Sequence, residues 1–257
     1  MLLGAHVPSA RPLAAADERG AEVLQIFLSA PRAWREPAER SDAEQLRADP
    51  RPIHVHSPYL INVASGDEQV RARSTASLAA TCRVAATIDA ASVVVHTGHG
   101  PSGEDPQVGR ERWREVLDGL ETEVPVLLES TAGGKNPVAR TLEQILALFE
   151  ALDGVATPLG FCLDTCHLHA AGEELVSATQ RLRDELGRID LIHLNDSRDP
   201  RGSARDRHEN LGKGQCPPDA LVETVRLADA PTVLETPDDA QAHAADLAWI
   251  RERLAQG

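Results

Sequence analysis

The segment SVVVHTGHGPSGEDPQVGRERWREVLDGLETEVPVLLES, residues 92–130, decides the expected fold because its pattern changes from strand to helix and back to strand. Its two ends, Ser92–Thr97 and Pro125–Ser130, are short apolar runs typical of buried strands. The stretch Gln107–Leu120 between them has the spacing of an amphipathic helix. A unit of this kind pairs its two strands in parallel and covers them with the helix.

The same alternation continues along the rest of the chain. A doubly wound open sheet is a competing interpretation, but it usually has fewer strands and a glycine-rich GxGxxG turn, which GAHVPSARP at residues 4–12 is not. Eight repeats in 257 residues instead predict a single-domain (β/α)8 TIM barrel over residues 1–257. The other expected strands are Leu2–Val7, Val23–Leu28, Pro52–Ser57, Leu159–Asp164, Leu191–Asp196 and Pro231–Thr236, and the other expected helices include Glu68–Ala90, Thr141–Leu152, Glu173–Leu186 and Asp239–Leu254.

Composition narrows the class of protein. The chain is 42% hydrophobic and 26% charged, which is typical of a globular protein. Its 26 Lys and Arg against 40 Asp and Glu give a net charge of −14, which argues against non-specific binding of nucleic acid over the whole surface. Four cysteines without a CxxC pair, no long apolar run and no signal-peptide pattern predict a cytoplasmic protein without a membrane span.

Polar residues follow the expected strands at one end. In a TIM barrel the C-terminal strand ends carry the active site, and six of the eight expected strands carry a His, Asp or Glu there. Burying such residues together is costly unless a divalent metal neutralises the carboxylates and accepts the imidazole lone pairs. A mixture of imidazole and carboxylate suits zinc or manganese. The six residues are His56, His96, Glu129, Asp164, His193 and Glu235.

Two short clusters add further metal ligands. LDTCH places His167 three residues after Asp164, and DRH places Asp206 and His208 two residues apart in a polar loop, where an extended stretch points them the same way. Ser130 and Thr131 have no His–Asp partner for a catalytic triad. The remaining candidates are interpreted as structural: His6, His54, His99, His169, Cys162 and Cys166.

With these residues in place, the chain resembles endonuclease IV, the zinc-dependent apurinic/apyrimidinic endonucleases of base-excision repair (AP endonuclease family 2). The likeness covers nearly the whole chain, and its blocks occur in the family's order. They are GAHV (4–7), LQIFLSAPRAW (24–34), HSPYLIN (56–62), VVVHTG (93–98), LLESTAG (127–133), CLDTCHLHAAG (162–172), HLND (193–196), GSARDRHENLG (202–212) and VLET (233–236).

The resemblance implies a site with three zinc ions, with manganese as an alternative at one position. His56, His96 and Glu129 would hold the first ion. Glu129 would bridge to a second, held also by Asp164, His193 and Glu235, and its catalytic role would be that of the bridging ligand of this metal pair. His167, Asp206 and His208 would hold the third. Arg32, Tyr59 and Leu60 match family residues that enter DNA at the lesion.

The implied activity is that of deoxyribonuclease IV of the phage-T4-induced type. A hydroxide shared by paired metals would hydrolyse the phosphodiester 5′ to an abasic site in duplex DNA, leaving 3′-hydroxyl and 5′-deoxyribose phosphate ends, and 3′ blocking groups are further substrates. We expect a monomer. The alternative is a metal-dependent sugar isomerase or epimerase of the same barrel class. The chain departs from the family in HTGHG, where HPG is usual after the fourth strand, and in the compact loop GGKNPVARTLEQ (133–144).

Overall fold

Eight parallel strands close into a barrel in the computed structural model, which describes residues 1–237 and 239–256. The order around the barrel is β1-β10-β7-β6-β5-β4-β3-β2, with β1 pairing to both β2 and β10, so the sheet has no free edge. The predicted TIM barrel is confirmed. The strands are β1 (Leu3–His6), β2 (Leu24–Phe27), β3 (Ile53–His56), β4 (Ser92–His96), β5 (Val126–Glu129), β6 (Leu159–Asp164), β7 (Leu191–His193) and β10 (Thr232–Leu234).

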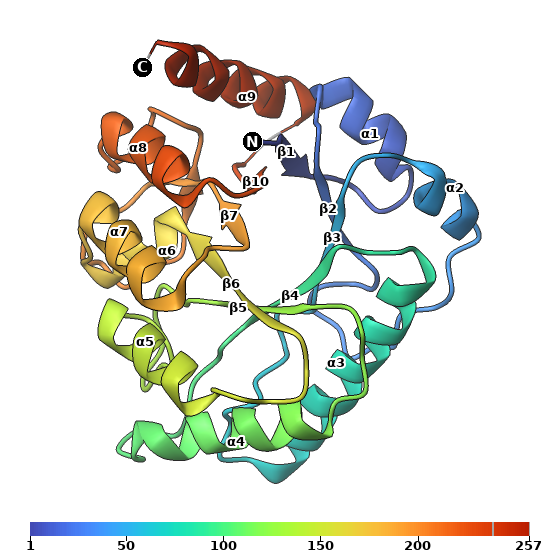
Figure 1. Cartoon of the computed structure of the whole chain (residues 1–257), viewed down its shortest axis with the longest axis vertical. Coiled ribbons are helices and arrows are strands. Elements are labelled where there is room, and N and C mark those ends of the chain that lie inside the picture. The colour runs from blue at the N-terminus through green and yellow to red at the C-terminus, as the bar shows by residue number, and fades with distance from the viewer. Residues whose placement is uncertain (238, 257) are drawn as a thin grey trace.

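A ring of helices surrounds the barrel, and the last helix packs beside the first (Figure 1). Side-chain caps fix where several helices begin; Thr141 and Gln144, for example, form a reciprocal capping box at the start of α5. The helices are α1 (Pro12–Arg19), α2 (Ala43–Ala48), α3 (Glu68–Thr87), α4 (Pro106–Gly119), α5 (Leu142–Ala151), α6 (Thr165–Ala171), α7 (Leu175–Leu186), α8 (Pro218–Ala228) and α9 (Ala240–Ala255).

The barrel interior is filled by side chains and is not a pore. A buried cluster of inward-facing residues occupies the middle of the barrel, while a larger apolar layer packs between the strands and the helices. Cys162 belongs to the inner cluster, so its predicted structural role agrees with its packing. The inner cluster consists of Val23, Val94, Leu127, Cys162, Leu191 and Val233.

Two expected elements differ from the structure. The strand expected over Leu191–Asp196 ends at His193, and Asp196 begins a separate antiparallel pair, β8 (Asp196–Ser197) with β9 (His208–Glu209). A further helix, α6, precedes the one expected over Glu173–Leu186. It begins immediately after β6 because the Asp164 side chain accepts the backbone N–H of His167 and caps its first turn.

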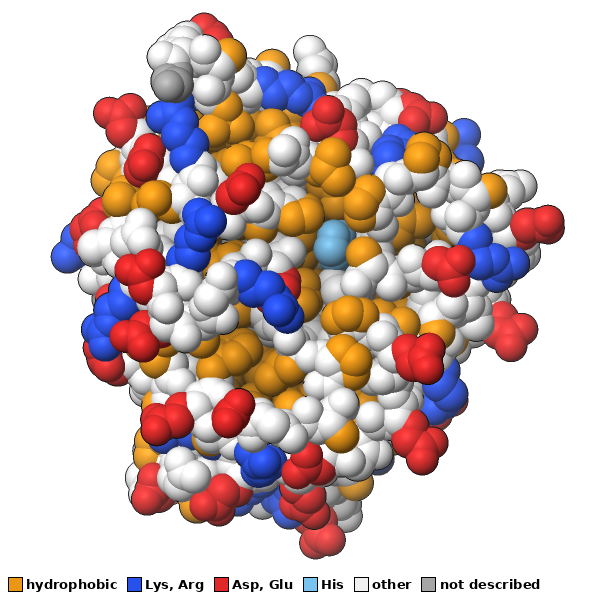
Figure 2. Space-filling view, viewed as in Figure 1, with side chains coloured by type: hydrophobic (Ala, Val, Ile, Leu, Met, Phe, Trp, Pro, Cys, Tyr) orange, Lys and Arg blue, Asp and Glu red, His pale blue; other side chains and the backbone are white. Residues whose placement is uncertain are grey.

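Figure 2 shows one face of the barrel, on which basic and acidic side chains are interspersed among apolar and uncharged atoms and a histidine side chain lies near the centre. Among the described residues, no helix is long and apolar enough to cross a membrane.

Candidate metal centre

The strand ends bring the six predicted residues together. His56, His96, Glu129, Asp164 and His193 are each the last residue of their strand, and Glu235 directly follows β10. Register places His96 opposite Glu129 and Asp164 opposite His193. The six side chains therefore converge at the C-terminal mouth of the barrel, as expected for this fold.

Glu129 is the centre of the cluster and is fully buried. Its Oε2 lies 3.2 Å from Nε2 of His56 and 3.1 Å from Nε2 of His96. Its Oε1 lies 3.0 Å from Nδ1 of His193 and 3.4 Å from Nδ1 of His167. One carboxylate thus faces four imidazoles.

Among the described residues, donor atoms converge in five groups, and two of them were not predicted: His56 with His193 and Glu235, and Asp164 with Cys166 and His208. The other three match the predicted sets. The first is His56, His96 and Glu129; the second is Glu129, Asp164, His193 and Glu235; the third is His167, Asp206 and His208. In each group the donor atoms lie within 4.8 Å of one another. Glu129 belongs to two groups, which is the arrangement that a bridging carboxylate requires.

The third group depends on the polar loop that contains β8 and β9. Oδ1 of Asp206 lies 3.3 Å from Nε2 of His167 and 3.0 Å from Nε2 of His208. Asp196 stabilises this loop with its buried carboxylate, which accepts four backbone N–H groups at 2.7–3.0 Å. These hydrogen bonds hold together the two ends of the loop that carries Asp206 and His208.

Backbone carbonyls orient three of the imidazoles. The Nδ1–H groups of His56, His167 and His208 donate to the carbonyl oxygens of Ser57, Ser130 and Glu235 at 2.7, 2.8 and 3.1 Å. Anchoring Nδ1 in this way leaves Nε2 of each ring facing the carboxylates of the cluster. This is the usual arrangement of a metal-binding histidine.

The charges in the cluster shift one another's pKa values. Burial alone would raise the pKa of Glu129, but His193 and His96 hold it well below its ordinary value. Burial alone would lower the pKa of His167 and His193, yet both are raised well above the ordinary value, His167 by Asp164 and Asp206 and His193 by Cys162, Glu235 and Glu129. For His208, burial is outweighed by Asp206, and its pKa rises to about 9. Without metal, protons compensate the buried carboxylates.

The residues fit a divalent metal on an observation independent of any family. Nε2 of His167 and Nε2 of His208 are buried and have no hydrogen-bond partner, because their contacts with Asp206 lack hydrogen-bond geometry. An unpaired buried ring nitrogen is costly, and a metal ion would accept its lone pair. Imidazole and carboxylate donors together suit zinc.

A cavity of about 550 Å³ opens over the cluster. Two of the three residues predicted to contact DNA, Arg32 and Tyr59, line it, whereas Leu60 does not. The Tyr59 ring stacks on His96 at 5.7 Å between centroids and meets the edge of His56 at 5.3 Å. One wall of the cavity is therefore an aromatic side chain that contacts two of the proposed metal ligands.

The loop that carries Tyr59 is joined to the unusual HTGHG loop. The Asn62 side chain donates to the carbonyl oxygen of His99 at 3.0 Å and accepts the N–H of His99 at 3.1 Å. Gly98 between them has a φ of +69°, and a Cβ there would lie 2.3 Å from Oδ1 of Asn62. Gly98, the first glycine of HTGHG, is thus required for this close contact.

Relatives of known family match the whole chain. It is 51% identical over 254 residues to the "Probable endonuclease 4" of Mycobacterium ulcerans, covering 99% of both chains. It superposes on the crystal structure of endonuclease IV from Thermus thermophilus with a TM-score of 0.85, 31% identity and complete coverage of both chains. The chain belongs to the endonuclease IV family.

Other similarities extend to the fold alone. A family profile described as a xylose isomerase-like TIM barrel matches residues 13–253 of this endonuclease IV family member. A D-tagatose 3-epimerase-like protein superposes with a TM-score of 0.76 at 18% identity, covering 100% of this chain and 99% of the other. Barrel architecture is therefore shared between endonuclease IV and sugar epimerases.

Sequence reasoning missed the side chains that surround the proposed ligands. Gln25 and Asn195 are fully buried, and their amides contact His193, Glu235 and Asp164. Each looks like one polar residue in an apolar run, and that interruption of the hydrophobic pattern is the signal that could have identified them. Arg198 and Arg207, which line the cavity, were also missed.

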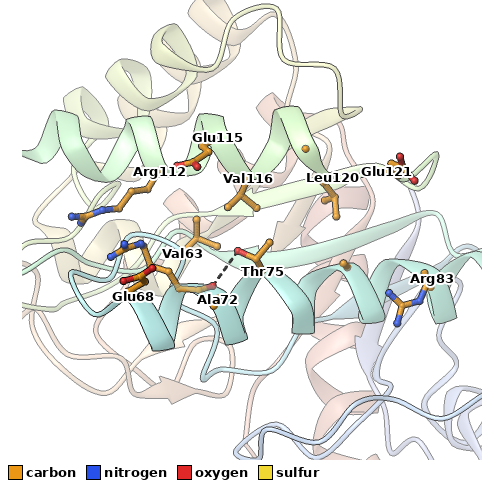
Figure 3. A pocket seen from close by; sticks show the side chains of 13 residues that line it. Val63, Glu68, Ala72, Thr75, Arg83, Arg112, Glu115, Val116, Leu120 and Glu121 are labelled. Carbon is orange, nitrogen blue, oxygen red and sulfur yellow. Dashed lines mark hydrogen bonds between the residues drawn. The ribbon is translucent and has the colours of Figure 1, made fainter.

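A second hollow lies on the outside of the barrel in this endonuclease IV family member. It has a volume of about 570 Å³ and lies between α3 and α4 (Figure 3). Val63, Val116 and Leu120 form its apolar part, and charges of both signs, among them Arg112 and Glu115, border it. It includes none of the proposed metal ligands.

Proposed function

We propose that this protein is a DNA-repair phosphodiesterase that hydrolyses the bond 5′ to abasic sites in duplex DNA. The observation that carries the proposal is the convergence of the nine predicted ligands at the barrel mouth in three groups, two of which share Glu129. Family membership supports the substrate class, since the relatives are named endonucleases. The products would be 3′-hydroxyl and 5′-deoxyribose phosphate ends, and removal of 3′ blocking groups is part of the same proposal.

Three zinc ions would occupy the three groups, with manganese as the alternative at one of them. When bound, such ions act as Lewis acids and lower the pKa of coordinated water to about 7. His56, His96 and Glu129 would hold the first, and Glu129 would share the second with Asp164, His193 and Glu235. His167, Asp206 and His208 would hold the third. The carbonyl-anchored imidazoles keep these donors aimed at the metals.

Arginines at the cavity would bind the phosphates beside the lesion. Arg32, Arg198 and Arg207 line the cavity around the metal ligands. Their guanidinium groups offer the planar donors that suit phosphate oxygens. Arg198 lies 3.3 Å from Glu209 and Arg207 pairs with Asp199, so these two guanidinium groups would be shared between carboxylates and phosphates. Their positive charge would help a protein of net charge −14 to hold DNA at the site.

Tyr59 and Leu60 would stabilise the DNA opened at the lesion. Tyr59 is 45% exposed although its ring rests on two of the proposed ligands, so it is available for contact from the cavity side. An abasic nucleotide has no base to unpair, which makes its extrusion less costly than that of an intact nucleotide. The enzyme would act as a cytoplasmic monomer.

The alternative function is a sugar isomerase or epimerase, and the epimerase-like neighbours share the barrel. Such a reaction needs one metal and an acid/base pair, and a single group such as Glu129, Asp164, His193 and Glu235 would satisfy it. It gives no role to His167, Asp206 and His208. The third group therefore favours the nuclease.

The deciding experiment uses a duplex oligonucleotide with one abasic-site analogue and three protein samples: as purified, stripped of metal, and reconstituted with zinc. We expect incision 5′ to the lesion that disappears on stripping and returns with zinc. Protein that contains three zinc ions but does not cut the duplex would contradict the proposal, and epimerisation of ketosugars by that sample would establish the alternative.

A further inference from the structure

Gln25 lies beneath the proposed metal centre, in β2, and is fully buried. Its amide makes three contacts, all with polar side chains at the mouth of the barrel. Oε1 lies 2.9 Å from Nε2 of His193, and Nε2 lies 2.7 Å from Oε1 of Glu235 and 3.0 Å from Nδ1 of His6. Gln25 is not itself among the proposed metal ligands.

These partners allow one orientation of the amide. The Glu235 carboxylate accepts hydrogen bonds and cannot donate, so the NH2 group of Gln25 has to face it. The amide oxygen then faces His193, which must donate from its Nε2. The tautomer of His193 is fixed as a result, and its Nδ1 faces the carboxylates of Glu129 and Glu235 at 3.0 and 3.3 Å.

His193 differs in this respect from three of the other proposed imidazole ligands. His56, His167 and His208 are anchored through Nδ1 by backbone carbonyls and direct Nε2 into the cluster. His193 is anchored through Nε2 and directs Nδ1 into the cluster, and its anchor is a side chain. Substitution can remove that anchor without altering the backbone.

We propose that Gln25 is a positioning residue for the metal held by Glu129, Asp164, His193 and Glu235. It selects the nitrogen that His193 offers to the metal and, through its NH2 group, holds the second ligand, Glu235, in place. The inference rests on the proposed function for its metal centre but not on the DNA substrate. Groups that orient metal ligands typically contribute about 10–100-fold to metal affinity or activity.

The test compares Gln25→Met with the wild type. Methionine keeps the length and bulk of the side chain and removes both hydrogen-bonding groups. Zinc retained per chain is measured after equilibration with graded concentrations of a chelator. We expect the variant to lose one of three zinc ions at a chelator concentration about 10–100-fold lower than the wild type requires. Its kcat should fall while KM for the abasic duplex stays unchanged.

Ser92→Ala is the matched control, because it removes another buried hydrogen bond of the barrel interior, the 2.7 Å contact with His54, without touching a proposed ligand. Its chelator curve should match that of the wild type. A Gln25→Met curve identical to this control, with unchanged kcat, would contradict the positioning role and show that Gln25 only fills space in the barrel.

A spectroscopic readout on the wild type covers the case in which Gln25→Met does not fold. Nitrogen-15 NMR of histidine-labelled, zinc-loaded protein should show His193 bound through Nδ1 with a protonated Nε2, unlike His56, His167 and His208. Binding of His193 through Nε2 would overturn the inference. Wild-type protein that holds three zinc ions but does not cut DNA contradicts only the proposed substrate, and protein that takes up no zinc contradicts both proposals.

Discussion

Glu129 is the residue on which the proposed metal centre depends most, because its two oxygens face His56 and His96 on one side and His193 and His167 on the other. Glu129→Gln keeps the shape and removes the charge. We expect it to release up to two of the three zinc ions and to lower kcat at least about 100-fold, since a ligand contributes more than the groups that orient it. Elemental analysis and single-turnover cleavage measure both effects.

Asp206→Asn is the comparison for that variant, because Asp206 belongs to the third group alone. Asp206→Asn should release one zinc ion and retain the other two. Retention of three zinc ions by Glu129→Gln would contradict the bridging assignment.

Zinc binding should displace protons. Without metal the pKa of His208 is about 9, so this ring is charged at pH 7, and the pKa values of His167 and His193 are raised in the same direction. Zinc binds only the neutral ring, so loading at pH 7 should release at least about one proton per chain. The His208 contribution should fall as pH rises through 9. Zinc titration in weak buffer with a pH indicator measures the release, and a value near zero would contradict the cluster's charge state.

Tyr59 should contribute to binding of DNA and not to binding of zinc. Its ring touches His96 and His56 only through ring contacts, so Tyr59→Ala should leave the zinc content unchanged. Loss of one stacking side chain should weaken binding of the abasic duplex by about 1–3 kcal/mol. Fluorescence anisotropy measures the change in binding of the duplex. It is recorded for a metal-free sample, which cannot cut the DNA, and for a zinc-loaded sample. Zinc lost from the variant would show that Tyr59 supports the cluster.

At this scale six of the residues that converge were predictable because strand ends are visible as the limits of apolar runs. His167, Asp206 and His208 were predicted from two short polar clusters, and the family resemblance implied their grouping. It did not predict Gln25, which interrupts VLQIFL without any sign of its partners. Those partners, His193 and Glu235, lie more than 160 residues away along the chain. Contacts between distant strands leave no local pattern in a sequence.

At the scale of elements, Asp196 holds together the two ends of the loop that carries Asp206 and His208. Its carboxylate accepts the N–H groups of Ser197, Gly212, Gly214 and Cys216. Asp196→Asn replaces one acceptor oxygen with a donor. We expect the free energy of unfolding in urea to fall by about 2–4 kcal/mol, because buried N–H groups lose their partner. The zinc ion at Asp206 and His208 should be bound more weakly.

An exposed aspartate provides the control for that variant. Asp184 is exposed on α7 and accepts a hydrogen bond from its neighbour Gln180, so Asp184→Asn should change stability by no more than about 0.5 kcal/mol. Equal effects of the two substitutions would contradict the proposed role of Asp196.

The same loop is the element that sequence reasoning described least well. The run LIHLND looks like one strand, yet the parallel strand ends at His193 and Asp196 pairs with Glu209 in the opposite direction. Pairing across a long polar loop depends on the Asp196 hydrogen bonds and not on hydrophobic alternation. Hydrophobic periodicity therefore predicted the barrel strands and could not predict this pair.

For the whole molecule, the net charge of −14 makes the salt dependence informative. Contacts of Arg32, Arg198 and Arg207 with three phosphates would give a slope near −2.7 in log affinity against log salt. The apparent Kd should then rise about 40-fold between 50 and 200 mM salt. Cleavage at sub-saturating DNA should fall in parallel, and turnover independent of salt would contradict a DNA substrate.

The fold as a whole was predictable because eight strand–helix repeats in one chain admit few closed arrangements. The convergence of the six strand-end residues followed from the fold alone, since parallel strands in a barrel all end at one mouth. The position of the third group relative to them did not follow, because it lies on a loop whose path is fixed by side chains.

The six strand-end ligands are distributed over six strands, from His56 in β3 to Glu235 just after β10, and β10 is also the strand that closes the sheet against β1. A chain still being synthesised therefore has neither a closed barrel nor a complete second metal group until residue 235 has emerged from the ribosome. Under the proposed function, a truncated translation product cannot cut DNA, because the last strand of the barrel supplies both the final ligand and the final pairing.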